Sequence, residues 1–257
     1  MIIDTHAHYD DERFDEDRDE LLLSMKEKGV EAIVNASASL RGCYDSLALA
    51  EKYDFMYFLA GIHPSDALDL EVAGNFDEIK RMAMHEKCVA VGEIGLDYYW
   101  DEPDRSIQKK WFEAQLNLAN EIKKPINVHS RDAYADTYDY IKSTKAYENG
   151  GIIHCFSYGV ECAREFLDMG FMLGIGGVLT FKNGKKLKEV VEYAPLDQIV
   201  LETDCPYLSP EPFRGHRNHS GNINYVAEKL AEIKNISVEE AIKATRENAL
   251  RVYKIAR

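Results

Sequence analysis

The stretch IIDTHAHYD, residues 2–10, begins the chain with a buried-strand pattern that ends in two histidines. Residues two positions apart in a β-strand point to the same face of the sheet, so His6 and His8 aim two imidazoles at one point. Two interpretations of this pair are open. The histidines bind a metal ion, for which imidazole is a common ligand, or they are ordinary buried histidines. The rest of the chain has to distinguish these interpretations.

Seven further apolar runs follow, separated by longer amphipathic stretches. We expect strands within residues 1–8, 31–37, 56–64, 88–97, 125–130, 151–157, 171–177 and 198–204. Apolar residues at three- and four-residue spacing between the runs, as in 108–124, indicate helices, and the Ser-x-x-Glu pattern at Ser237 predicts a capped final helix. Eight such units predict an α/β fold, a (β/α)8 TIM barrel, as one domain over 1–257, with an open doubly wound sheet as the alternative.

Composition limits the possible partners. A formal net charge of −14 excludes a broad basic surface for duplex nucleic acid, and nucleic acid fits only where positive charge is local, as with bound divalent ions. The sequence shows no membrane span and no secretory signal. Five cysteines without a CxxC pair are typical of reduced thiols, so we expect a cytoplasmic protein. We also predict no obligate protein partner.

Histidines and carboxylates gather where the predicted strands end. The six main candidates for metal ligation are His6, His8, Glu93, His129, His154 and Asp204. The carboxyl ends of barrel strands share one face, where such enzymes carry their active sites. Four imidazoles and two carboxylates exceed what one tetrahedral ion with an open position needs, and they suit two divalent ions that share a carboxylate. His63 and Glu202 are candidates for an additional metal site or for positioning the ligands.

Each candidate also has a non-functional interpretation. His129 or His154 alone would be an ordinary strand-end histidine bonded to backbone, and Glu93 between glycines would be a solvated turn residue. The concentration of all six at strand ends favours the metal site.

These residues lie in longer motifs that carry a family resemblance. The motifs are GIHP (61–64), VGEIGLDY (91–98), VHSR (128–131), HCF (154–156), ETDCPYL (202–208) and Arg214-Gly215. With His6-Ala7-His8 they make the chain similar, in order and over nearly its whole length, to the TatD family of metal-dependent hydrolases, which resemble amidohydrolase-type barrels. The resemblance implies a TIM barrel, two divalent ions and 3′–5′ deoxyribonuclease or related phosphodiesterase activity on DNA ends or single strands.

The resemblance also implies roles for individual residues. His6, His8 and Asp204 would hold one ion and His129 and His154 the other, with Glu93 bridging them. Asp204 would then orient water and take its proton, as a general base within hydrogen-bond reach can. The metal identity stays open among Zn, Mn, Fe, Co, Ni and Mg.

Substrate contacts are predicted from arginines and aromatic residues. Arg131, Arg214 and Arg217 are candidates for binding a phosphate, with solvated loop arginines as the alternative. Residues 98–100, Tyr-Tyr-Trp, would stack a terminal base or simply pack beside the rim. The family's Arg-Gly-Lys-Arg-Asn run has His216 in place of lysine here, which weakens the expected grip of this loop on phosphate and leaves the metal ligands untouched.

Two other functions are compatible with the same site. Activated water attacks a carbonyl as readily as a phosphorus, so amide, ester or lactone hydrolysis, including removal of aminoacyl esters from tRNA, is the enzymatic alternative. A metal-binding partner protein without turnover is the alternative from another class. It would not need Asp204, a carboxylate placed to activate water.

Overall fold

Eight parallel strands in one sheet form the centre of the computed structural model, which describes residues 1–256. The strands are β1 (Ile2–Ala7), β2 (Val30–Asn35), β3 (Met56–Ala60), β4 (Cys88–Asp97), β5 (Ile126–Arg131), β6 (Gly151–Ile153), β7 (Met172–Ile175) and β8 (Ile199–Leu201). They follow one another around the sheet in chain order. This order confirms the predicted barrel, because a doubly wound sheet would reverse its strand order part-way.

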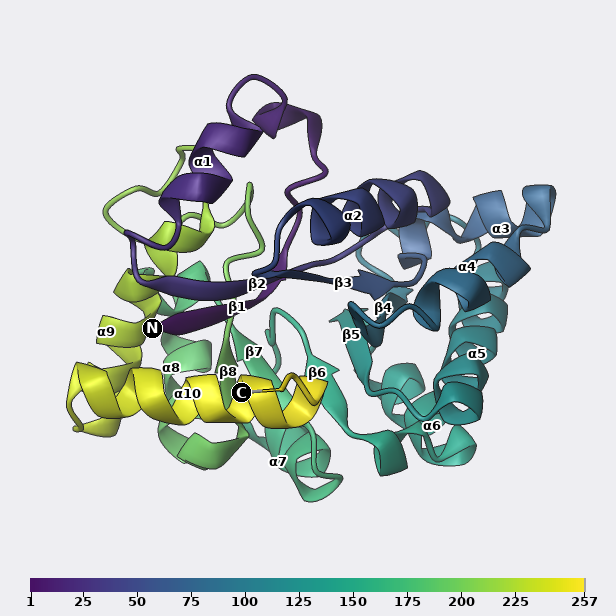
Figure 1. Ribbon diagram of the computed structural model, residues 1–257. Helices are drawn as coiled ribbons and strands as arrows, with labels where there is room; N and C mark the ends of the chain where they lie inside the picture. Colours follow the sequence, from purple (N-terminus) through teal and green to yellow (C-terminus); the bar gives the residue numbers. More distant parts are fainter. Residues whose placement is uncertain (257) are drawn as a thin grey trace.

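Helices connect the strands on the outside of the barrel (Figure 1). They are α1 (Arg18–Ser24), α2 (Leu40–Lys52), α3 (Ala67–Ala73), α4 (Phe76–Ala83), α5 (Arg105–Ile122), α6 (Tyr134–Thr144), α7 (Val160–Asp168), α8 (Lys185–Tyr193), α9 (Ile223–Lys234) and α10 (Val238–Tyr253). Within the described part of the chain, no helix has the length and apolar character that crossing a bilayer requires.

The first and last strands meet and nearly close the barrel. The Thr5 hydroxyl donates to the Leu201 carbonyl at 2.9 Å, and the backbone N–H of Asp204 donates to the His6 carbonyl, also at 2.9 Å. These bonds fix the segment after β8 beside the end of β1. His8 and Asp204, almost two hundred residues apart in sequence, therefore face the same rim.

Helix α10 covers one side of the strands, as Figure 1 shows in yellow. Its residues Leu250, Val252 and Tyr253 pack with buried strand residues, among them Ile3 and Val200, in a cluster separate from the main core. The Tyr253 hydroxyl donates to the Thr5 carbonyl at 2.9 Å. The helix thus completes the core and ties itself to β1.

Six of the eight strands end earlier than their predicted apolar runs, three of them by three or more residues. β3 stops at Ala60, β6 at Ile153 and β8 at Leu201, whereas the runs continued to 64, 157 and 204. The backbone leaves the extended conformation at Cys155 and Asp204, which have φ values of 45° and 55°. Strand pairing therefore ends where the chain turns to present its polar side chains.

Replacing Ser237 by alanine tests the predicted cap, which the structure confirms. The Ser237 hydroxyl accepts from Glu240 N at 3.1 Å, and the Glu240 carboxylate accepts from Ser237 N at 2.9 Å. Because Ser237→Ala removes this acceptor, we expect the free energy of unfolding to fall by about 1 kcal/mol in urea denaturation. Ser143→Ala, at an exposed helical position, serves as the control, and an equal loss there would contradict the capping argument.

Candidate metal centre

The six predicted ligands come from five strands and converge on one point of the rim; Glu93 was predicted at a strand end, but β4 continues beyond it to Asp97. His6 belongs to β1 and His8 follows it directly, Glu93 lies within β4 and His129 within β5. His154 and Asp204 follow β6 and β8. Five groups of three potential ligand atoms within 4.8 Å of one another occur among the described residues. Two of them consist entirely of the six predicted ligands, His6–His8–Glu93 and Glu93–His129–His154.

Glu93 lies between these two groups and is 3% exposed. Its Oε2 atom is 3.3 Å from His6 Nε2 and 3.7 Å from His8 Nε2. Its Oε1 atom is 3.0 Å from His129 Nδ1 and 3.3 Å from His154 Nε2. One carboxylate oxygen therefore faces each histidine pair, which is the placement that a bridging ligand needs.

The separations fit a metal ion of ordinary size. Metal–ligand distances of about 2.0–2.2 Å place tetrahedral ligand atoms about 3.3–3.6 Å apart. His6 Nε2 and His8 Nε2 are 3.1 Å apart, and Asp204 Oδ1 is 3.2 Å from His8 Nε2. Nitrogen and carboxylate donors at this spacing are the set that divalent transition metals bind.

Oxygen acceptors face the other nitrogen of each imidazole. The hydrogen-bond partners are Ala36 O for His8 at 2.9 Å, Asn127 Oδ1 for His6 at 3.0 Å and Asp97 Oδ2 for His129 at 3.0 Å. Glu202 Oε1 lies 3.2 Å from His154 Nδ1, which makes no hydrogen bond. An acceptor on one ring nitrogen holds the proton there and leaves the other nitrogen free to bind metal. The rings of His6, His8 and His129 are thus oriented as ligands.

Both carboxylates of the centre are ionised at neutral pH. Burial alone would raise the pKa of Glu93, but the neighbouring histidines, His154 first, hold it well below its usual value. The pKa of Asp204 is also lowered, because the hydrogen bond with His8 and the nearby histidines outweigh its burial. Metal ligation requires this deprotonated form.

His63 and Glu202 both lie at the centre. His63 Nε2 is 3.7 Å from Glu93 Oε1, and burial, reinforced by His129, lowers the pKa of His63 to about 3. Its ring is therefore neutral. Glu202 is fully buried beside His154.

Asp97 is a residue of the centre that sequence reasoning did not assign. It holds His129, and its Oδ1 accepts from the backbone N–H groups of Tyr99 and Trp100 at 3.0 and 3.1 Å. Strand alternation carried a signal, because Glu93 and Asp97 are four residues apart in β4 and share a face.

Gly95 allows β4 and β5 to approach closely enough for this arrangement. It has a φ of 151°, and a Cβ atom there would lie 1.8 Å from the His129 carbonyl oxygen. Any larger residue would push β5 away from β4. His129 would then leave Glu93 and Asp97.

A cavity of about 500 Å³ opens over the centre. Six carboxylates line it, those of Asp10, Asp11, Asp66, Glu93, Asp97 and Asp204, together with Arg131, Trp100 and Tyr207. The guanidinium of Arg131 lies 3.8 Å from the ring centre of Tyr99. One cationic side chain, Arg131, and exposed aromatic rings therefore lie beside a strongly acidic group of carboxylates.

The other two predicted arginines lie elsewhere. Arg217 pairs with Asp17 at 2.5 Å and also donates to the Arg13 carbonyl at 2.6 Å. Arg214 lies over the ring of Phe181, 4.2 Å from its centre. Neither lines the cavity over the metal centre.

Comparison with known proteins decides the family. A family model described as TatD related DNase matches residues 3–254. The chain belongs to the TatD family. It is 44% identical over 255 residues to the uncharacterized metal-dependent hydrolase YabD of Bacillus subtilis, covering 99% of this chain and 100% of that protein. It is 34% identical over 261 residues to the uncharacterized metal-dependent hydrolase YcfH of Escherichia coli, covering 99% and 96%.

Solved structures agree with this assignment. YJJV, a TatD homolog from Escherichia coli, superposes with a TM-score of 0.92 at 29% identity, over 99% of this chain and 98% of that chain. A PTE-like lactonase from Deinococcus radiodurans has a TM-score of 0.66 at 14% identity, which shows a shared fold alone. The predicted family is confirmed, and the chain is a TatD-family metal-dependent hydrolase.

Asp97→Asn tests whether the acceptor behind His129 sets metal affinity. Asparagine keeps the size of the side chain but removes the charge that orients and polarises the imidazole, so we expect Zn²⁺ affinity to fall about 10- to 100-fold in chelator competition. Asp101→Asn, which changes a carboxylate paired with Arg105 at 2.6 Å, is the matched control. Equal affinity in both variants would argue against this role.

Proposed function

We propose that this TatD-family protein is a metal-dependent phosphodiesterase that removes nucleotides from the 3′ ends of DNA, with single strands and frayed ends preferred. The observation that carries the proposal is the position of Glu93 between two histidine pairs, with one oxygen facing each pair. Two cations in these positions would be bridged by one carboxylate, which suits displacement at phosphorus.

Different residues of the site would have different roles in hydrolysis. When bound, a pair of divalent cations supplies an activated water near neutral pH and neutralises charge that develops on phosphoryl oxygens. Asp204 is ionised, partly exposed and close to His8, so it is in the deprotonated form in which a carboxylate can orient a water molecule and take its proton. His6, His8, His129 and His154 would hold the cations, together with Glu93.

The rim of the cavity supports a nucleic-acid substrate. Trp100 and Tyr207 are 67% and 46% exposed and line the cavity, and Tyr99 is stacked by Arg131. Exposed rings beside a cation stack bases without sequence preference. Arg131 lines the cavity over the metal centre, where a phosphate would bind, whereas Arg214 and Arg217 contact Phe181 and Asp17 outside it.

Hydrolysis of amides, esters or lactones by the same residues is the second candidate. The ligand set suits attack at carbon as well as at phosphorus, and Arg131 and the exposed rings favour the nucleic-acid substrate. We further propose a cytoplasmic location, because Cys43, Cys88, Cys155, Cys162 and Cys205 are all free thiols.

Removing Glu93 or His129 tests the assignment. We expect Glu93→Ala and His129→Ala to abolish metal-dependent hydrolysis in a parallel assay of bis-p-nitrophenyl phosphate, a carboxylic ester and single-stranded DNA. Both variants should retain the circular dichroism of the barrel. His85→Ala, at a histidine outside the centre, is the control. Full activity of both variants with metal supplied would refute the site, and activity on the ester alone would refute the phosphodiesterase.

Substituting the three arginines ranks their contacts with DNA. We expect Arg131→Ala to raise the KM for single-stranded DNA about tenfold, because a charge-assisted bond to phosphate is lost. Arg214→Ala and Arg217→Ala should change KM less than threefold. A larger rise in KM for Arg217→Ala than for Arg131→Ala, measured with the same 5′-labelled strand, would indicate that the phosphate binds at the loop that contains Arg217.

A further inference from the structure

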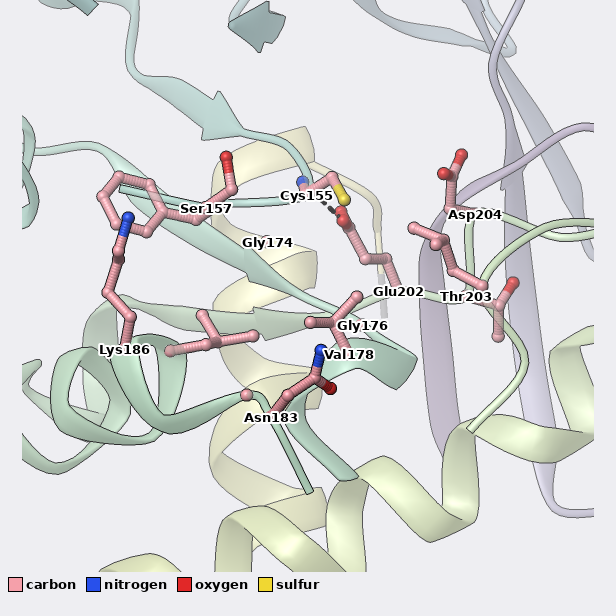
Figure 2. Close-up of a pocket in the computed structure, with 14 residues that line it drawn as sticks. Cys155, Ser157, Gly174, Gly176, Val178, Asn183, Lys186, Glu202, Thr203 and Asp204 are labelled. Atoms are coloured by element: carbon pink, nitrogen blue, oxygen red, sulfur yellow. Dashed lines mark hydrogen bonds between the residues drawn. The ribbon is translucent and has the colours of Figure 1, made fainter. Parts of the chain in front are cut away.

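A second cavity adjoins the metal centre on the side of β6, β7 and β8. It has a volume of about 160 Å³ and shares Asp204 with the cavity over the metals. Figure 2 shows it between Cys155 and Ser157 on one side and Gly176, Val178 and Asn183 on the other. We refer to it as the side cavity.

The walls of the side cavity are largely apolar. Phe156, Val178, Leu187 and Leu208 line it, and glycine backbones complete it. A volume of this size accommodates a six-membered ring, since an engineered protein cavity of about 150 Å³ binds benzene.

One buried polar atom of the side cavity has no partner. Glu202 is fully buried, and its Oε1 accepts from the backbone N–H of Cys155 at 2.6 Å. Its Oε2 has no hydrogen-bond partner. Buried polar atoms are almost always paired. Oε2 has almost no accessible surface where it lies, so a donor from a ligand in the side cavity would pair with it only after the carboxylate turns toward the cavity.

The surroundings of Glu202 are built to accept that carboxylate. A Cβ atom at Gly174 would lie 2.3 Å from Oε2, so only glycine leaves room for it against β7. Lys186 stands on the side of the cavity away from Glu202 in Figure 2. A ring bound between them would donate to Glu202 at one edge and present an acceptor to Lys186 at the other.

We propose that the side cavity binds the base of the 3′-terminal nucleotide and prefers cytosine. The cytosine amino group donates to carboxylates, whereas thymine has a carbonyl oxygen at that position. This inference rests on the proposed phosphodiesterase function, because Asp204, shared by both cavities, then stands between the bound base and the scissile phosphate.

The test compares oligothymidylates that differ only at the 3′-terminal nucleotide. The ends are cytosine, N4,N4-dimethylcytosine, thymine and an abasic sugar. We expect kcat/KM for the cytosine end to exceed the values for the dimethylcytosine, thymine and abasic ends about tenfold. Equal values for the cytosine and abasic ends would overturn the base site and leave the phosphodiesterase intact. No hydrolysis of any end would overturn the phosphodiesterase, and the assignment to a terminal nucleotide with it.

Two variants reduce the side cavity without touching the metal ligands. Val178→Phe fills it, and we expect the cytosine preference to disappear. Gly176→Ala adds one methyl group 3.5 Å from the Glu202 carbonyl oxygen, an ordinary contact distance, and should reduce the preference while preserving the fold. Val72→Phe, at a residue that is 81% exposed on α3, is the matched control. A full cytosine preference in both cavity variants would overturn the proposal.

Binding gives a readout that does not depend on turnover. Saturation-transfer NMR with millimolar deoxycytidine should show contact with the metal-free protein, because the side cavity is formed by the chain alone. We expect Val178→Phe to lose this signal and Val72→Phe to keep it. Absence of deoxycytidine binding to the unmodified protein would refute the base site.

Discussion

The contact of Glu93 with two histidine pairs is the constraint on which the rest of the rim depends. A buried carboxylate is costly unless opposite charge or hydrogen-bond donors surround it. Here His6 and His129 approach its two oxygens at 3.3 and 3.0 Å. Strand β4 must therefore place Glu93 at the centre of the rim, and the strands β1, β5 and β6 must position their histidines in contact with it.

A chain of hydrogen bonds connects this contact to the scaffold. The Asn127 amide accepts from His6 Nδ1 at 3.0 Å and donates to the Tyr253 hydroxyl of α10 at 2.9 Å. Asp4 accepts from the backbone and hydroxyl of Thr203 at 3.0 and 2.6 Å, which fixes the residue preceding Asp204. The candidate ligands are thus held in place by hydrogen bonds to residues that are not themselves candidate ligands. Such support gives a site its precision.

The sequence predicts the barrel and the convergence of the six candidate ligands because both follow from local pattern. Strand alternation and the shared face of parallel strand ends need no knowledge of distant contacts. The role of Asp97 and the partner of Arg217 depend on side-chain geometry, and Asp17 lies two hundred residues from Arg217 in sequence. The side cavity arises only where β6, β7 and β8 meet the loop around Leu208. No periodicity in the chain encodes it.

The charge of the rim links the cations to substrate binding as well as to chemistry. Six carboxylates surround the central cavity, and Arg131 is the cationic side chain among the lining residues. A DNA strand that approached this surface without cations would meet repulsion that only salt screens. Two divalent cations, as proposed, would add four positive charges and, with Arg131, offset five of the six carboxylate charges, while the outer surface of a chain with a net charge of −14 stays negative. Repulsion of a DNA strand would then be largely removed at the metal centre and would remain elsewhere, which favours a single strand end over a long duplex.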